Sequence, residues 1–403
     1  MEARGPHDRL TAPGLRAGTP AEAGLDAAEL DLLVRDVRGL TQGADPWCAG
    51  AVVLAGRGPV VAVREAAGWA VRYAAYDEGN GRGAELPDPG GAAVPGGAVK
   101  VPMRTGTRFD LASLTKLFTA MVAVQQAERG ALDLDRPAAA YVPAFGAAGK
   151  AAVTVRQLLT HTSGLRPELP FYEREDSADR YAPLWEEEPV TPPGTAHLYS
   201  DLNLIALQAV LEQVAGRRLD ALVRDGVTGP LGMTATGFGP LARVDDVAAT
   251  EDQRRPWAKL DRGMLRGEVH DENAYALGGV AGHAGLFSTA GDLAVLCRTL
   301  LDGGTYGGER VLAAESAAAL LDPPGLGFGT DQPWFMGELA GRGAAGHTGF
   351  TGTSLVLDRA TDTFLVLLAT TVHPRRRPAD SRPRAAAATR LARAVRAAEP
   401  GES

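Results

Sequence analysis

Strand patterns at both ends of this chain enclose a long block of helical patterns, and this order constrains the fold most. Two apolar runs near the start, at 49–55 and 60–64, are joined by Gly-Arg-Gly, which is typical of a β-hairpin. Helical patterns dominate residues 113–270, and strand patterns return afterwards at 285–288, 353–357 and 363–370. We therefore predict an α/β (α+β) fold, in which both ends of the chain build one antiparallel sheet and the helical block is an insertion.

This order divides the chain into expected parts of one compact domain. We expect residues 1–20 to form a disordered tail, residues 21–112 and 275–398 an α/β lobe, and residues 113–274 a mostly helical lobe. The α/β lobe should carry an N-terminal helix to about residue 40 and a C-terminal Ala/Arg-rich helix over 385–398. The segment 77–99 is rich in Gly and Pro and should be a surface excursion.

Several polar residues have the spacing of helix caps. Asp26 can cap the first helix, with Glu29 reaching back, and Thr154 can cap the segment that follows it. Asp201 can cap a helix that Gly216 closes.

Composition narrows the classes of function. The 403 residues are 45% hydrophobic, which is enough for a large core, and the net charge of −8 argues against nucleic acid as a partner. The arginines of 375–396 are accordingly expected to form a solvated face. Cys48 and Cys297 are expected to be isolated buried residues. No apolar run resembles a secretory signal or a membrane span, so we expect a cytoplasmic protein without a membrane partner.

The tetrapeptide Ser113-Leu114-Thr115-Lys116 places a hydroxyl and an amine on one face of a helix start. A serine needs a neighbouring base to act as a nucleophile. Lys116 can be that base only if its surroundings lower its pKa, and the apolar flank at 117–122 is expected to supply them. The tetrapeptide is a weak signal alone and gains weight from its partners downstream.

Two such partners follow in order. Tyr199-Ser200-Asp201 comes after a Pro/Gly-rich loop, and His347-Thr348-Gly349 opens a late strand. With the stretches 158–165 and 278–289, this ordered set resembles the serine β-lactamase and penicillin-binding protein superfamily, nearest to class C β-lactamases and family VIII carboxylesterases. The resemblance spans roughly residues 20–398 and implies a β-lactamase-like fold, an acyl-enzyme mechanism and no cofactor.

The resemblance also implies roles for individual residues. Ser113 would be acylated, and Lys116 and Tyr199 would form the proton-transfer pair, without a decision on which is the base. The backbone N–H groups of Ser113 and Phe350 would form the oxyanion hole. Substrate binding would fall to four residues: Asp201, His347, Thr348 and Gly349.

Two positions depart from the usual pattern of the superfamily. His347 stands where a lysine is usual, and Asp201 stands where an asparagine is usual. Histidine is mostly neutral at pH 7, and Asp201 adds negative charge, so both changes should weaken the binding of carboxylate-bearing substrates. Asp201 could equally be a plain helix cap.

Other motifs carry less weight. His270-Asp271-Glu272 lacks a second cluster with ligand spacing, so we expect a structural loop near the cleft and no metal site. His161 is expected to be a buried hydrogen-bonding residue. Neither a phosphate loop, a dinucleotide fingerprint nor a G-x-S-x-G elbow is present.

The sequence therefore predicts a serine hydrolase of small esters, similar to carboxylesterases. Within the same fold, a β-lactamase, a D-amino-acid peptidase and an acyltransferase remain open, so the expected partner is a small ester, amide or β-lactam. A non-catalytic ligand-binding or sensor domain is the alternative from another class. The oligomeric state cannot be deduced.

Overall fold

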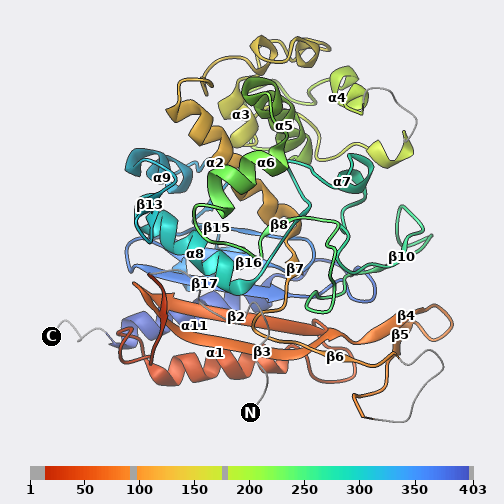
Figure 1. Ribbon diagram of the computed structural model, residues 1–403, viewed down its shortest axis with the longest axis vertical. Coiled ribbons are helices and arrows are strands. Elements are labelled where there is room, and N and C mark those ends of the chain that lie inside the picture. Colours follow the sequence, from red (N-terminus) through yellow and green to blue (C-terminus); the bar gives the residue numbers. More distant parts are fainter. Residues whose placement is uncertain (1–13, 91–97, 175–179, 399–403) are drawn as a thin grey trace.

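The computed structural model describes residues 14–90, 98–174 and 180–398. Its largest sheet has the strand order β1-β3-β2-β17-β16-β15-β14, with β6 paired to β3 beside this path. Neighbouring strands are antiparallel except β1 and β3, which are parallel. Because β2 pairs with β17, the two ends of the chain meet in the middle of one sheet (Figure 1). This is the sheet that the sequence predicted.

The strands of this sheet differ greatly in length. The longest form the centre, and short ones lie toward the edges. In chain order they are β1 (Arg16–Ala17), β2 (Gly50–Arg57), β3 (Val60–Val71), β6 (Val101–Pro102), β14 (Gly329–Thr330), β15 (Ala345–Thr348), β16 (Ser354–Asp358) and β17 (Thr363–Ala369).

Smaller sheets join the segments around it. The strands β7 (Phe109–Asp110), β11 (Leu286–Ser288) and β8 (Gly237–Phe238) form one sheet of three. The other strands form two-stranded pairs: β4 (Tyr73–Asp77) with β5 (Arg82–Glu85), β9 (Asp252–Gln253) with β10 (Gly263–Met264), and β12 (Thr305–Tyr306) with β13 (Glu309–Arg310).

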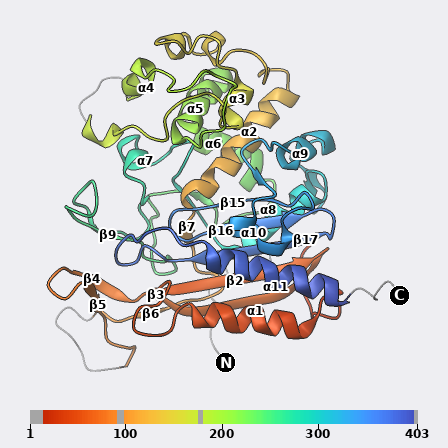
Figure 2. The same cartoon turned by 180° about the vertical axis from the view of Figure 1, so that it is seen from behind.

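Helices cover both faces of the large sheet. The first and last helices, α1 and α11, pack side by side on one face (Figures 1 and 2). The short helix α10 packs against α11. On the other face, α8 contacts β2, β16 and β17, and the helices of the larger core are stacked beyond it. The helices are α1 (Ala27–Gly39), α2 (Thr115–Glu128), α3 (Val155–Leu159), α4 (Ala182–Glu186), α5 (Asp201–Ala215), α6 (Leu219–Val223), α7 (Glu272–Ala276), α8 (Ala290–Leu301), α9 (Ala314–Leu321), α10 (Pro333–Met336) and α11 (Arg382–Ala398).

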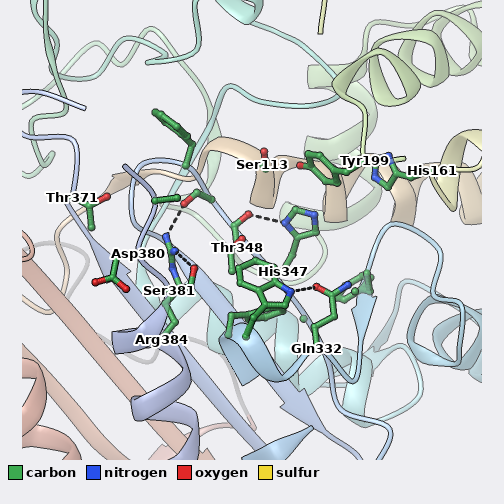
Figure 3. Close-up of a pocket in the computed structure, with 18 of the residues that line it drawn as sticks. Ser113, His161, Tyr199, Gln332, His347, Thr348, Thr371, Asp380, Ser381 and Arg384 are labelled. Carbon is green, nitrogen blue, oxygen red and sulfur yellow. Dashed lines mark hydrogen bonds between the residues drawn. The ribbon is translucent and has the colours of Figure 1, made fainter. Parts of the chain in front are cut away.

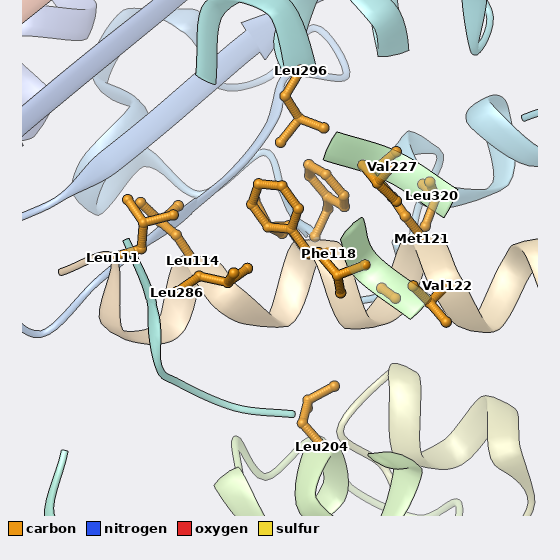
Figure 4. Packing of buried hydrophobic residues seen from close by; sticks show 14 of the residues in the cluster. Leu111, Leu114, Phe118, Met121, Val122, Leu204, Val227, Leu286, Leu296 and Leu320 are labelled. Atoms are coloured by element: carbon orange, nitrogen blue, oxygen red, sulfur yellow. The ribbon is translucent and has the colours of Figure 1, made fainter. Parts of the chain in front are cut away.

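The helix α2 lies at the centre of the larger core. Every side chain from Thr115 to Gln126 is buried, so the helix is apolar on nearly all sides, as expected for a helix surrounded by protein. Phe118 and Met121 pack among side chains from several helices and strands (Figure 4). A second core lies between the sheet and the pair α1/α11. Consequently α2 provides a rigid base for the residues at its N-terminus.

Most of the predicted elements are present. Asp26 caps α1, accepting the N–H of Glu29, whereas the side chain of Glu29 accepts from Arg390 of α11 instead of reaching back. Thr154 and Gln157 form a capping box at the start of α3. Both cysteines are buried and free, as expected.

Other predictions need qualification or remain open. Residues 1–13 of the predicted tail lie outside the described residues, as do 91–97 of the predicted excursion, and Arg16–Ala17 already pairs with β3. The division into two lobes at residues 113 and 274 stays a prediction. Among the described helices, none combines the length and the apolar character needed to cross a bilayer.

Candidate active site

A strained turn presents Ser113 at the entrance to α2. Ala112 has φ of 46°, a left-handed conformation that costs a non-glycine residue on the order of 1 kcal/mol. The buried carboxylate of Asp110 holds this turn, because one of its oxygens accepts the N–H of Ala112 at 2.8 Å. Its other oxygen accepts the N–H of His270 at 2.6 Å. Ser113 therefore follows a fixed turn and precedes a fully buried helix.

Lys116 lies one turn further along and is completely buried. Its Nζ donates to Ser113 Oγ at 2.8 Å and to the carbonyl oxygen of His283 at 3.2 Å, and it lies 2.7 Å from Asp201 Oδ1. Burial lowers the pKa of Lys116, but Asp201 and Tyr199 together outweigh burial and the net effect raises it. The expectation that its apolar flank would lower this pKa is therefore wrong. Residues 117–122 do not reveal that the carboxylate of Asp201 lies beside Lys116.

Asp201 does not cap α5. The N-cap position is Ser200, whose side chain makes no capping bond, and Asp201 is the first residue of the helix proper. Its carboxylate turns to Lys116 instead, so the predicted cap is wrong. A carboxylate at a helix N-terminus is still favourable, because the helix dipole is positive there.

Tyr199 lies beside this pair at the edge of the cleft. Its ring centroid is 5.1 Å from Lys116 Nζ and 4.6 Å from the ring of His161. Burial raises the pKa of the Tyr199 phenol, against the lowering effect of Lys116 and of hydrogen bonds with Lys116 and Ser113. The alcohol, amine and phenol thus meet in one place.

His161 fixes the backbone next to Tyr199. Its Nδ1 accepts the N–H of Ser200 at 3.1 Å and lies 3.0 Å from Asn203 Nδ2, so the ring proton resides on Nε2. Burial lowers the pKa of His161 well below the usual value, which keeps the ring neutral. It is the buried hydrogen-bonding residue that the sequence indicated.

The loop after β15 is tied to the strand that leads to Ser113. Thr351 Oγ1 donates to the carbonyl of Asp110 at 2.8 Å, and Thr353 Oγ1 donates to the carbonyl of Leu111 at 3.0 Å. A Cβ on Gly349 would lie 2.4 Å from Leu111 O, so only glycine permits this approach.

This approach brings Phe350 next to the nucleophile. Outside their own turns, the backbone N–H groups of Ser113 and Phe350 donate to no acceptor in the described part of the chain. Two free donors in this position could receive an oxyanion. The phenyl ring of Phe350 is 53% exposed and stacks on His270 at the rim, with centroids 5.7 Å apart.

Ser113 and Tyr199 open into a cleft of about 1100 Å³ (Figure 3). His347, Thr348 and Gly349 line it with Phe350, so all the predicted substrate-binding residues except Asp201 border this space. The Nδ1 of His347 lies 2.7 Å from Thr348 O, so Nδ1 carries the proton and Nε2 is an acceptor. Burial and the charge of Lys116 lower the pKa of His347 to about 4, which leaves it uncharged at neutral pH.

Arg384 is a buried cation of this cleft, which Arg377 and Arg382 also line, and the sequence did not predict its place there. Arg384, on α11, is only 7% exposed and donates to Gly349 O at 3.0 Å and to Ser381 Oγ at 2.9 Å (Figure 3). Its Nε has no hydrogen-bond partner, and no carboxylate of the described residues lies within ion-pair distance of it, although the charge of Asp380 in the same cleft acts on it. Burial lowers the pKa of Arg384 to about 10, so it stays charged at neutral pH. Since the neighbouring arginines are expected on a solvated face, nothing in the local sequence distinguishes this one.

A second buried pair lies behind Lys116. His283 Nε2 is 2.9 Å from Asp271 Oδ1, and the same segment supplies the carbonyl that accepts from Lys116. Asp201, Asp271 and His283 are close enough together to be considered as metal ligands. However, the ammonium of Lys116 already neutralises Asp201 and would repel a cation, so these residues fit an ion-pair network better than a metal site.

The flanking residues of Asp271 have structural partners. Glu251 receives His270 Nε2 at 2.8 Å and Arg376 Nη2 at 2.6 Å, and Arg376 also contacts Glu272. Burial alone would raise the pKa of Glu251, but the hydrogen bonds from His270 and Arg376 lower it to about 2. This cluster joins β9 to the segment before α11, as a structural loop should.

The lowered pKa of Glu251 in the folded state predicts how the stability contributed by this cluster depends on pH. The stabilisation by Glu251 should be fully present above its unfolded pKa of about 4.3 and lost as the pH falls through about 2. We expect Glu251→Gln to lower the free energy of unfolding by about 3 kcal/mol at neutral pH and to flatten its decline in acid. Denaturant unfolding at a series of pH values would measure this, with the exposed Glu315 of α9, changed to Gln, as the control. Parallel curves for the wild type and Glu251→Gln would contradict the assignment.

Comparison with known proteins identifies the family of this chain. The sequence model of the Beta-lactamase family matches residues 37–389. A protein of Escherichia coli (strain K12) named "Putative D-alanyl-D-alanine carboxypeptidase" is 36% identical over 311 residues, which cover 68% of this chain and 71% of the relative. An "N-acetylmuramyl-L-alanine amidase" of Bacillus subtilis (strain 168) is 32% identical over 306 residues, covering 67% and 69%.

Solved structures share the fold. A penicillin-binding protein homologue from Caulobacter crescentus superposes with a TM-score of 0.66 at 22% identity, covering 93% of this chain and 99% of its own. The hydrolase EstCE1, described as having promiscuous acyltransferase activity, gives a TM-score of 0.64 at 22% identity, covering 91% and 99%. Both similarities concern the fold alone.

Proposed function

This chain belongs to the β-lactamase family and is a hydrolase of that family, and from this premise we propose that it forms an acyl-enzyme on Ser113 and cleaves peptides that end in a D-amino acid. The convergence of Ser113, Lys116 and Tyr199 in one cleft carries the proposal. Ser113 Oγ attacks the carbonyl carbon, and Lys116 and Tyr199 transfer its proton to the leaving amine. The N–H groups of Ser113 and Phe350 receive the oxyanion, and water then releases the acyl group.

The choice of a peptide over an ester rests on the charge in the cleft. His347 is neutral, so it cannot replace the usual lysine as the partner of a terminal carboxylate. Arg384 supplies a buried positive charge without a carboxylate partner in the described chain, on the other side of Gly349. A terminal carboxylate of the substrate would complete this ion pair. The relatives named as putative D-alanyl-D-alanine carboxypeptidases support the same class of substrate.

A substrate comparison tests this proposal. We would measure kcat/KM for an acylated D-Ala-D-Ala peptide, its L-Ala-L-Ala isomer, a p-nitrophenyl butyrate ester and a cephalosporin. The proposal requires that the D-peptide be cleaved faster than its L-isomer and release D-alanine. If the ester is turned over while neither peptide is cleaved, the peptide assignment is wrong.

An esterase is the second candidate, because of one observation. The uncharged His347 offers an acceptor, Nε2, to the cleft, and it does not attract a carboxylate. A neutral ester is therefore not penalised at this position. The same substrate comparison distinguishes the two candidates.

Arg384→Gln should separate carboxylate binding from catalysis. A hydrogen bond to a charged group contributes about 1.5–3 kcal/mol. We therefore expect kcat/KM for the D-peptide to fall about 10- to 100-fold, while kcat/KM for its C-terminal carboxamide changes little. The decisive measurement is the ratio of kcat/KM for the D-peptide to kcat/KM for its carboxamide. Distortion of the oxyanion loop through Gly349 would slow the cleavage of both substrates equally.

Arg393→Gln is the matched control for this experiment. Arg393 lies on the same helix α11 but pairs with Glu338 away from the cleft. The control should leave the ratio unchanged. An equal loss for the carboxylate and the carboxamide in Arg384→Gln would remove Arg384 from substrate recognition.

A further inference from the structure

Three oxygen atoms lie close to the ammonium of Lys116, besides the phenol of Tyr199. Ser113 Oγ, Asp201 Oδ1 and His283 O lie 2.8, 2.7 and 3.2 Å from Nζ. Among these three, only Asp201 carries a negative charge. The resting site is thus an ion pair between Lys116 and Asp201, to which the nucleophile is hydrogen-bonded.

The other titratable groups around Lys116 do not compete for this role. His347 of β15 and His161 after α3 are held neutral by burial. Asp271 already has His283 as its partner. The remaining group is Tyr199, whose phenol has an intrinsic pKa about 6 units above that of a carboxyl group.

This difference decides which group carries the negative charge. When a carboxylate and a phenol approach the same ammonium, the carboxylate is ionised and the phenol keeps its proton. Burial and the nearby charge of Asp201 both raise the pKa of Tyr199 further. With asparagine at position 201, the phenol of Tyr199 would be the remaining acidic group beside Lys116, and its raised pKa would keep it protonated until the pH is alkaline.

From this geometry we infer that Asp201 is the proton acceptor for acylation, acting through Lys116, and that Tyr199 is a protonated phenol in the resting enzyme. This inference rests on the proposed acylation of Ser113. It assigns to Asp201 a proton-transfer role in place of the substrate-binding role that the sequence suggested.

The proton transfers balance without another reactant. As the bond from Ser113 Oγ to the carbonyl carbon forms, the Oγ proton passes to Lys116 Nζ, which gives a proton to Asp201 Oδ1. When the bond to the leaving group breaks, Tyr199 donates its hydroxyl proton to the departing atom. Asp201 then returns its proton through Lys116 to the Tyr199 oxygen, so these three groups regain their resting states while Ser113 stays acylated until water releases the acyl group.

The pH dependence of acylation tests the inference. We would follow the labelling of Ser113 by a fluorophosphonate, under single-turnover conditions, in the wild type and in Asp201→Asn. In the wild type, the rate should already be at its plateau at neutral pH, because the Lys116–Asp201 ion pair supplies the acceptor. In Asp201→Asn, the acceptor must be Tyr199 or Lys116, and either group must first lose its proton. The rate at neutral pH should therefore fall at least about 100-fold and rise about tenfold per pH unit toward alkaline pH.

Two further variants complete this experiment. Asp201→Glu should return the rate at neutral pH toward that of the wild type. Asp220→Asn should change nothing, since Asp220 likewise lies in the first turn of a helix, α6, but outside the cleft. A uniform loss at every pH in Asp201→Asn would mean that Asp201 only shapes the site, and the inference would be wrong.

A measurement on the wild-type protein needs no variant at position 201. The ¹³Cζ resonance of Tyr199, assigned with Tyr199→Phe, should be that of a phenol at neutral pH, and a phenolate signal would overturn the inference. If Ser113 is not labelled at any pH, the proposed function fails instead. The two failures are therefore distinguishable.

Discussion

Ser113→Ala is expected to reduce turnover of every substrate by about 10⁴- to 10⁶-fold, because no other group can form the acyl-enzyme. The fold should survive, since the change removes one acceptor from Lys116 and leaves Asp201 and the His283 carbonyl in place. The expected cost in the free energy of unfolding is about 1 kcal/mol. Steady-state kinetics and intact-mass detection of the acyl-enzyme would measure both consequences.

The matched control is Ser316→Ala. Ser316 lies on α9, outside the cleft, and its loss should change neither turnover nor the covalent mass. If Ser113→Ala kept full hydrolysis of a substrate that the wild type cleaves, the acyl-enzyme on Ser113 would be refuted. Retention of the covalent adduct in that variant would refute it equally.

The local part of this site could be predicted from the sequence. Ser113 and Lys116 lie three residues apart on one helix, and helix geometry alone brings their side chains together. The hairpin β2–β3 and the cap of α3 are local in the same sense. Tyr199 and His347 could be assigned to the site only through the resemblance to a known superfamily, because they are far from Ser113 in the sequence and local geometry does not show that they are close in space.

The electrostatic part could not be predicted. Asp201 has the position of a helix cap, and only the packing of α5 against α2 turns its carboxylate toward Lys116. Arg384 lies in an arginine-rich segment, and it becomes buried only because α11 folds back beside the Gly349 loop. The pKa of Lys116 is therefore raised, whereas its neighbours in the sequence indicate that it is lowered.

Lys116→Met is the substitution expected to damage both activity and stability. Methionine matches the length of the side chain but not its charge, so it leaves the Asp201 carboxylate without its cation in a mostly buried place. Breaking a buried ion pair costs about 3–5 kcal/mol, and because Asp201 is 22% exposed we expect the lower end, about 3 kcal/mol. Acylation should fall by at least about 10³-fold, because the path that carries the proton of Ser113 to Asp201 is broken at Lys116.

A second substitution separates these two effects. Asp201→Asn added to Lys116→Met removes the stranded charge, so the free energy of unfolding should return to within about 1 kcal/mol of the wild type while acylation stays absent. Lys150→Met is the matched control, since Lys150 is equally buried but donates to backbone carbonyls outside the cleft. Lys150→Met should be less stable than the wild type but should still be acylated at Ser113. If the double variant were no more stable than Lys116→Met, the carboxylate of Asp201 would not depend on Lys116, and the ion pair at the centre of this site would have to be abandoned.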